Sequence, residues 1–141
     1  MDRQDIIDHL LDHYEQPRNY GSLEKADVTA SGGHPECSDI VTIHLKINPT
    51  TDTVELMTFE GQGCTISQAA ASILTEQMVG KGLNDIRQMD FDTVVEIMGR
   101  EIARSRPRCA SLALETLRTA VIKYQHEHHQ QTVDTGQRSE E

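Results

Sequence analysis

Apolar residues recur at helical spacing near the start of the chain. Within residues 5–14 they fall every three to four positions, on one face of a helix: Ile6, Ile7, Leu10, Leu11 and Tyr14. Pro17 and the turn-forming residues up to Gly21 then interrupt the pattern. We therefore predict an amphipathic helix over residues 5–14, followed by a loop over residues 22–36, which contain two glycines and a proline.

After this loop the pattern changes to an alternation of apolar and polar side chains. In residues 40–47 the apolar positions are Val41, Ile43, Leu45 and Ile47. Period-two alternation is typical of a strand with one buried face. A turn at residues 48–52 separates this strand from a second β-rich run at residues 54–59, so the two runs predict an antiparallel hairpin.

Helical spacing returns immediately after Cys64. Ser67 is in position to cap this helix, and Gly80 and Gly82 are in position to end it. Further periodic stretches predict two short helical pieces and one long helix, at residues 83–88, 91–99 and about 110–124.

The order of these elements predicts one α+β domain, a small antiparallel sheet packed on one side by helices. The chain has 141 residues, enough for one modest core, and with 4% aromatic residues that core must be largely aliphatic. We place the domain at residues 1–125. The polar stretch 126–141 lacks periodicity and predicts a disordered tail.

The charge of the chain limits its partners. Thirteen basic and 23 acidic residues give a formal net charge of −10, which argues against nucleic acid as the main partner. No signal-peptide pattern and no apolar stretch of about 18 residues is found in the sequence, so we expect a cytoplasmic protein that does not enter membranes. In a reducing compartment three cysteines favour metal binding or thiol chemistry over disulfides. Nothing in the sequence requires more than a monomer or a weak oligomer.

Three cysteines and one aspartate stand out as candidate ligands. Cys37 and Asp39 are two residues apart at the start of the first predicted strand, so their side chains point to the same side. Cys64 and Cys109 each stand just before a predicted helix, whose N-terminus favours a thiolate. Arg108 adds a positive charge beside Cys109.

Three thiolates and one carboxylate suit either tetrahedral zinc or the four ligand positions of a [2Fe–2S] cluster. The cysteines are 27 and 45 residues apart, and no Cys-x-x-Cys pair occurs among them. The spacing therefore leaves open the alternative that one cysteine is buried and the other two are incidental.

Four runs of residues resemble a known family. They are Asp12-His13-Tyr14-Glu15-Gln16-Pro17-Arg18-Asn19, Cys37-Ser38-Asp39, Phe59-Glu60-Gly61-Gln62-Gly63-Cys64-Thr65-Ile66-Ser67 and Cys109-Ala110-Ser111-Leu112-Ala113. In this order they resemble the iron–sulfur cluster assembly scaffold family, of the IscU, SufU and NifU N-terminal type. The resemblance covers about residues 5–125.

The resemblance implies a three-stranded sheet packed by helices, with a metal site at one end. It implies a scaffold rather than an enzyme, which accepts sulfur from a pyridoxal-phosphate-dependent cysteine desulfurase and iron from an iron donor. Such a scaffold assembles a transient [2Fe–2S] cluster and passes it to apo-proteins. The implied ligands and sulfur acceptors are Cys37, Cys64 and Cys109, with Asp39 as a fourth, harder and more labile ligand.

The sequence departs from the IscU branch before the third cysteine. That branch has a histidine at the position of Arg108, and a Leu-Pro-Pro-Val-Lys segment read by a chaperone where this chain has residues 103–108. A basic residue there is similar to the SufU branch, so the alternative function is a zinc-dependent sulfur acceptor, a sulfurtransferase that stimulates a desulfurase. The arginines of this segment are either a solvated run or a docking and thiolate-stabilising patch.

Histidines outside this set predict no further site. His9 and His13 are four residues apart on the first helix, and we expect a structural or surface role for them. His44 alternates away from the apolar face of its strand, so we expect it to be solvated.

Overall fold

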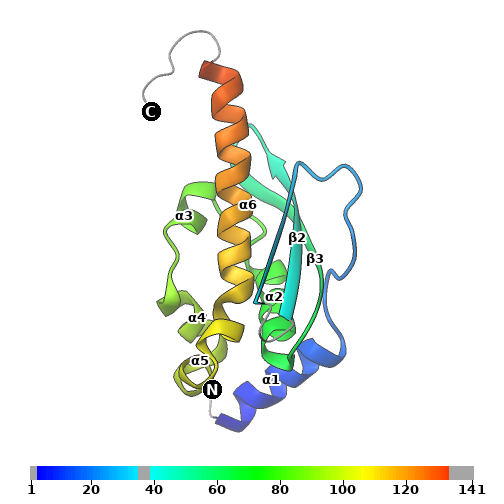
Figure 1. The fold of residues 1–141 in the computed structure, drawn as a ribbon, viewed down its shortest axis with the longest axis vertical. Helices are drawn as coiled ribbons and strands as arrows, with labels where there is room; N and C mark the ends of the chain where they lie inside the picture. Colours follow the sequence, from blue (N-terminus) through cyan, green and yellow to red (C-terminus); the bar gives the residue numbers. More distant parts are fainter. Residues whose placement is uncertain (1–2, 35–38, 134–141) are drawn as a thin grey trace.

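The structure, a computed structural model, describes residues 3–34 and 39–133. The elements are, in order, α1 (Arg3–Glu15), β1 (Val28–His34), β2 (Asp39–Asn48), β3 (Thr53–Gln62), α2 (Thr65–Gln77), α3 (Leu83–Arg87), α4 (Phe91–Met98), α5 (Arg100–Ser105) and α6 (Pro107–Val133). The strands form one antiparallel sheet in the order β1-β2-β3, with α2 and α6 packed along it (Figure 1). The predicted α+β class, with a three-stranded sheet backed by helices, is confirmed. Within the described part of the chain, a helix with the length and apolarity to cross a membrane is not found.

The central strand β2 supplies much of the core. Val41, Ile43 and Leu45 are fully buried on the face that carries the helices, whereas Ile40 on the other face is exposed. Removing apolar surface from water stabilises the fold by about 25 cal/mol per Å². One buried face on a pleated strand requires alternation, and this is why the sequence pattern predicted the strand correctly.

The predicted loop at residues 22–36 was wrong for residues 28–34, which form strand β1. Val28 pairs with Leu45 and Gly32 with Val41, so β1 is an edge strand of the sheet. Two adjacent glycines are an ordinary loop signal, but here Gly32 has a packing role. A Cβ atom at Gly32 would collide with Thr116 Oγ1 of α6, so the missing side chain lets the long helix approach the strand.

The helix after Cys64 begins earlier than predicted. Cys64 rather than Ser67 is the N-cap of α2, with extended backbone and a sulfur that accepts a hydrogen bond from Ser67 N–H. Residues 67–75 of α2 are all buried, and the small side chains of Ala69, Ala70 and Ala71 allow close packing on several sides of the helix. The start of α2 is thereby held next to the end of β3.

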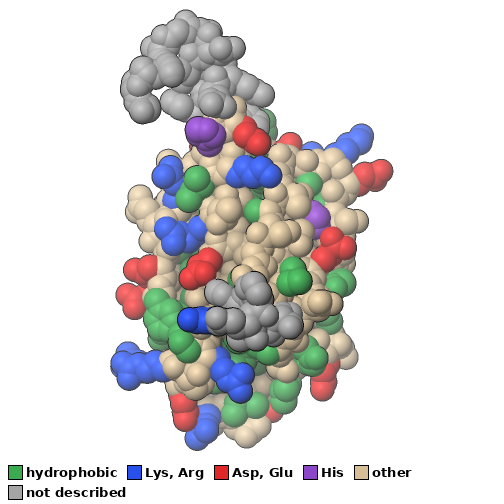
Figure 2. Space-filling model, in the orientation of Figure 1, with side chains coloured by type: hydrophobic (Ala, Val, Ile, Leu, Met, Phe, Trp, Pro, Cys, Tyr) green, Lys and Arg blue, Asp and Glu red, His purple; other side chains and the backbone are tan. Residues whose placement is uncertain are grey.

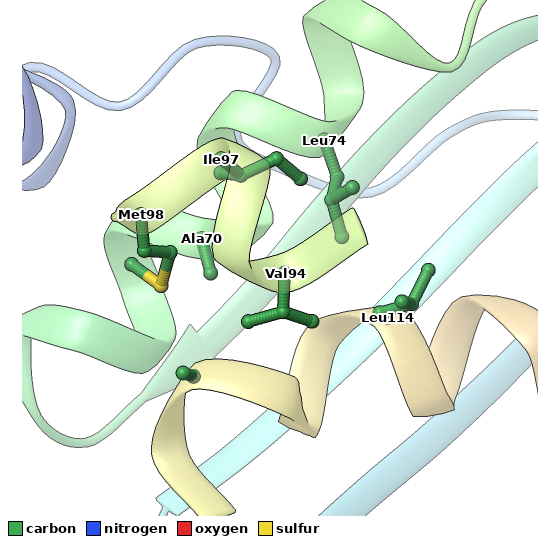
Figure 3. Close-up of a pocket in the computed structure, with 7 residues that line it drawn as sticks. Ala70, Leu74, Val94, Ile97, Met98 and Leu114 are labelled. Atoms are coloured by element: carbon green, nitrogen blue, oxygen red, sulfur yellow. The ribbon is translucent and has the colours of Figure 1, made fainter. Parts of the chain in front are cut away.

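Helix α4 packs over a small apolar cavity of about 10 Å³ (Figure 3). Its lining comes from α2, α4 and α6: Ala70, Leu74, Val94, Ile97, Met98, Ala110 and Leu114. An apolar cavity of this size stays dry, since it offers a water molecule no polar partner. Packing is therefore slightly incomplete under α4, beside the first turn of α6.

The last third of the chain differs from the prediction in two ways. Gly99, with a φ of 86°, ends α4, and the unpredicted short helix α5 follows it. Helix α6 begins at Pro107 and continues to Val133, so residues 126–133, predicted as disordered tail, are helical. Residues 126–133 contain neither glycine nor proline, and their straight-chain glutamines and glutamate favour a helix even without an apolar pattern.

Candidate metal centre

Three of the four predicted ligand residues come together at one end of the sheet. One ligand atom from each of Asp39, Cys64 and Cys109 lies within 4.8 Å of the others. They come from three elements: the first residue of β2, the N-cap of α2 and the first turn of α6. The fourth predicted ligand, Cys37, lies outside the described residues, two positions before Asp39.

Asp39 lies between the two cysteines and is almost completely buried, with 1% of its surface exposed. Its Oδ1 accepts a hydrogen bond from Cys64 N–H at 2.9 Å, and its Oδ2 accepts one from Cys109 Sγ at 3.1 Å. Burial raises the pKa of this carboxyl, but the hydrogen bonds from Cys109 and Cys64 outweigh burial and leave the pKa below its ordinary value. Asp39 is therefore held as a carboxylate inside the protein.

The glycine before Cys64 makes room for this carboxylate. Gly63 has a φ of 139°, which side-chain-bearing residues rarely adopt, and a Cβ atom there would collide with Asp39 Oδ1. Two residues earlier, a Cβ atom at Gly61 would collide with the carbonyl oxygen of Ile40. The Gly-Gln-Gly turn thus lets the end of β3 pass close to the start of β2.

Cys64 has a half-buried side chain and occupies the N-cap of α2. Its Sγ lies 3.5 Å from Ser67 N, which donates to it, and Ser67 Oγ donates to the Cys64 carbonyl oxygen at 3.1 Å. Sulfur thus takes the capping role that a serine or aspartate oxygen usually has. This geometry orients the sulfur toward the helix N-terminus, beside the Asp39 carboxylate.

Cys109 is buried, and its thiol is in a different state from the one predicted. Burial, followed by the Cys64 sulfur and the Asp39 carboxylate, raises the pKa of Cys109 to about 12. The predicted activation by a helix start and by Arg108 is therefore wrong for this thiol in the metal-free protein. Arg108 is exposed at the surface, and its charge does not offset burial of the thiol and the hydrogen bond to Asp39.

This donor set fits the predicted cargo or ion. Two ligands bound 2.3 Å from a tetrahedral zinc ion lie about 3.8 Å apart, so donors within 4.8 Å of one another need only small movements. Thiolate sulfur suits zinc and iron–sulfur clusters, and a carboxylate completes either set as a harder ligand.

A buried polar link, which the sequence did not reveal, anchors the helix that begins at Cys64. His13 of α1 has 2% of its surface exposed, and its Nδ1 is 2.7 Å from Ser72 Oγ on α2. The same hydroxyl accepts a hydrogen bond from Arg18 N–H at 2.9 Å. Burial lowers the pKa of His13, with Arg18 and His9 acting in the same direction and Glu76 and Asp12 opposing. His13 thus has a structural role, as predicted.

Tyr20 packs against β3 near the end that leads to Cys64. Its hydroxyl donates to the Gly61 carbonyl oxygen at 3.2 Å, and its ring packs edge-to-face on Phe59 with centroids 5.1 Å apart.

The predicted solvated position of His44 was wrong. It has 9% of its surface exposed, and its ring nitrogens contact Thr29 Oγ1 and Glu60 Oε1 at 3.0 and 2.8 Å.

The chain is similar to known proteins in both sequence and fold. The family model of the NifU-like N terminal domain matches residues 6–131. The chain is 32% identical to the iron–sulfur cluster assembly scaffold protein IscU 1 of Archaeoglobus fulgidus, over 83% of this chain and 74% of the relative. It is 34% identical to the scaffold protein IscU of Aquifex aeolicus, over 82% and 73% of the two chains. The fold matches the N-terminal part of a nitrogen-fixing NifU-like protein from Brucella abortus, with a TM-score of 0.70 and 17% identity over 86% and 98% of the chains.

Proposed function

This chain belongs to the family of NifU-like N-terminal domains, and from that premise we propose that it is an iron–sulfur cluster assembly scaffold. Relatives that carry this name share about a third of its residues over most of its length. The observation that carries the proposal is the meeting of Asp39, Cys64 and Cys109 within 4.8 Å. With Cys37 as the fourth ligand, they would hold a transient [2Fe–2S] cluster as cargo.

The Asp39 carboxylate would favour release of a bound cluster from the scaffold. Asp39 is a hard oxygen ligand among soft sulfurs, and such a ligand binds a cluster less firmly than a fourth thiolate. The two hydrogen bonds that it accepts, from Cys64 N–H and from Cys109 Sγ, also keep it in place when no cargo is bound. A stable resting state and a weak fourth bond together suit a protein that passes its cargo to apo-proteins.

Sulfur would reach the centre from a pyridoxal-phosphate-dependent cysteine desulfurase in the cytoplasm. A thiolate of the scaffold attacks the outer sulfur of the desulfurase persulfide, a new S–S bond forms, and the desulfurase cysteine leaves as a thiolate. This exchange needs no oxidant. An iron donor and an electron source are then required to convert the accepted sulfur to sulfide.

Anaerobic reconstitution tests the proposal. The metal-free protein, mixed with desulfurase, cysteine, ferrous iron and a reductant, is expected to develop the visible absorption of a [2Fe–2S] cluster. The double variant Cys64→Ser/Cys109→Ser is the control and is expected to develop none. A correctly folded wild-type protein that stays colourless under these conditions would contradict the proposal.

Arg108 favours a second candidate, a zinc-dependent sulfur acceptor that stimulates the desulfurase without carrying a cluster. Arginine is always protonated and cannot serve as the additional nitrogen ligand that a histidine before Cys109 would offer. Three thiolates and one carboxylate already complete a tetrahedral zinc site. This function predicts a persulfide on a cysteine, detected by mass spectrometry, that forms only when zinc is bound and without any cluster absorption.

A further inference from the structure

A group of arginines lies directly before Cys109, in a protein that is otherwise strongly acidic. Residues 100–108 contain four arginines and one glutamate, whereas the whole chain has a net charge of −10. The arginines are Arg100, Arg104, Arg106 and Arg108, and all four are exposed. Figure 2 shows Lys and Arg side chains in the lower part of the molecule, where Figure 1 places α4, α5 and the start of α6.

Three of these arginines are not used to hold the fold together. Among the described residues, no carboxylate lies within salt-bridge distance of Arg100, Arg104 or Arg106. The single glutamate of the segment, Glu101, already pairs with Arg3 at 3.3 Å. Elsewhere basic side chains do make internal contacts, such as Lys123 Nζ with the Thr29 carbonyl oxygen at 3.2 Å.

The arginines have opposing effects on the two helices of this region. Arg100 and Arg104 are four residues apart on α5, where like charges repel each other by a few tenths of a kcal/mol. Arg104 and Arg106 lie at the C-terminal end of α5, where a positive charge is favourable, but Arg106 also precedes α6, whose dipole a positive charge opposes. Helix stability alone therefore does not account for the arginines of this segment.

The backbone that carries the arginines is ordered. Arg106 N–H donates to the Ile102 carbonyl oxygen at 3.1 Å, and Ala110 N–H donates to the Arg106 carbonyl oxygen at 2.9 Å. Ala103, between the arginines of α5, is fully buried. The arginines are therefore carried by α5, by the ordered link at Arg106 and by the first turn of α6, which also holds Cys109, the hydrogen-bond donor to Asp39.

We propose that the arginine patch, Arg100, Arg104, Arg106 and Arg108, docks an acidic segment of a partner protein beside the candidate metal centre. Guanidinium groups bind carboxylates through paired hydrogen bonds, and opposite charge speeds and orients the encounter. A nucleic acid strand fits less well, because a long polyanion would extend from the patch onto the acidic remainder of the surface. The docking depends on the patch alone, so it can fail or succeed independently of cluster assembly.

A labelled peptide of about ten glutamates serves as the probe, with binding to the metal-free full chain followed by fluorescence anisotropy at about 20 mM salt. The double variant Arg104→Glu/Arg106→Glu is expected to weaken binding about tenfold, and salt is expected to weaken binding to the wild type. The matched control is Lys25→Glu/Lys81→Glu, which changes the net charge equally at two exposed sites away from the segment. It is expected to weaken binding less than about twofold. Thermal melts check that both variants fold.

Three results would overturn the proposal. One is the absence of peptide binding to the wild type at low salt. Another is an equal loss of affinity in both double variants, which would mean that net charge alone attracts the peptide. The third is tighter binding of a uridylate oligonucleotide of the same length, which would assign the patch to nucleic acid.

Discussion

Cys64 and Cys109 belong to one candidate centre, yet their sulfurs have different surroundings in the metal-free protein. The sulfur of Cys64 is half-buried and accepts a hydrogen bond from the start of α2. The sulfur of Cys109 is buried at the start of α6 and donates its proton to Asp39. Both residues stand where a helix begins, so a helix start alone does not determine the state of a thiol. Burial and the nearest charge decide it.

The largest effect on stability should follow from a substitution that fills the space between residue 63 and Asp39. Gly63→Ala adds a Cβ atom against Asp39 at a φ of 139°, and we expect it to lower the free energy of unfolding by about 3 kcal/mol. Gly80→Ala is the control, because Gly80 also has a positive φ but has open space around it. It should cost about 1 kcal/mol, the strain of the backbone alone. Urea unfolding measures both, and equal losses would contradict a collision at Asp39.

The difference between the two thiols should appear directly in their chemistry. In metal-free protein near neutral pH, iodoacetamide should modify Cys64 at least about a hundredfold faster than Cys109, because Cys109 is buried and its pKa is about 12. Peptide mass spectrometry at timed intervals gives the two rates. In urea the rates should converge. Similar rates in the folded protein would mean that the buried hydrogen bond to Asp39 does not protect Cys109.

A smaller change should follow when the carboxylate loses its charge. Asp39→Asn removes the negative charge that helps raise the pKa of Cys109, so the alkylation rate of Cys109 should rise about tenfold while that of Cys64 changes little. Asp92→Asn, on the exposed start of α4, is the control and should leave both rates unchanged. An unchanged Cys109 rate in Asp39→Asn would assign its protection to burial and to the Cys64 sulfur.

The smallest effect concerns the anchor of the Cys64 helix. Burial lowers the pKa of His13, so the unfolded chain takes up a proton at a higher pH than the folded protein. Stability that is fully present above the ordinary value of 6.5 should therefore decline as the pH falls toward the lowered pKa. Urea unfolding at pH of about 7.5 and 5.5 should show a larger loss for the wild type than for His13→Gln, whose amide does not titrate in this range. Equal losses would exclude His13 as the source.

Alternating and helically spaced apolar residues were enough to predict the elements that bury one regular face. Alternation revealed β2, and helical spacing revealed α1, α2 and the middle of α6. Strand β1 was missed because the reason for Gly32 is Thr116, which lies on another element far along the chain. The short helix α5 was missed because six residues after a glycine hold too little periodicity.

The candidate centre shows the same limit. Side-chain chemistry and sequence position made Asp39, Cys64 and Cys109 candidates, and the resemblance of the surrounding runs to a known family was needed to choose them over the alternative of incidental cysteines. The state of each thiol depends on its tertiary surroundings, so the sequence predicted the wrong state for Cys109. The link from His13 to Ser72 joins residues 59 positions apart, and no local pattern reveals it.

The hydrogen bond from Cys109 to Asp39 connects occupancy of the centre with the acidity of the solution. With its pKa at about 12, Cys109 carries a proton at neutral pH, and it must lose that proton before its sulfur can bind a cation. Binding of a cation therefore releases the proton of Cys109, and a lower pH favours protonation of this sulfur again. Once the sulfur is protonated again, Asp39 can accept the same bond as before. Binding of a cation at the centre should therefore weaken as the pH falls.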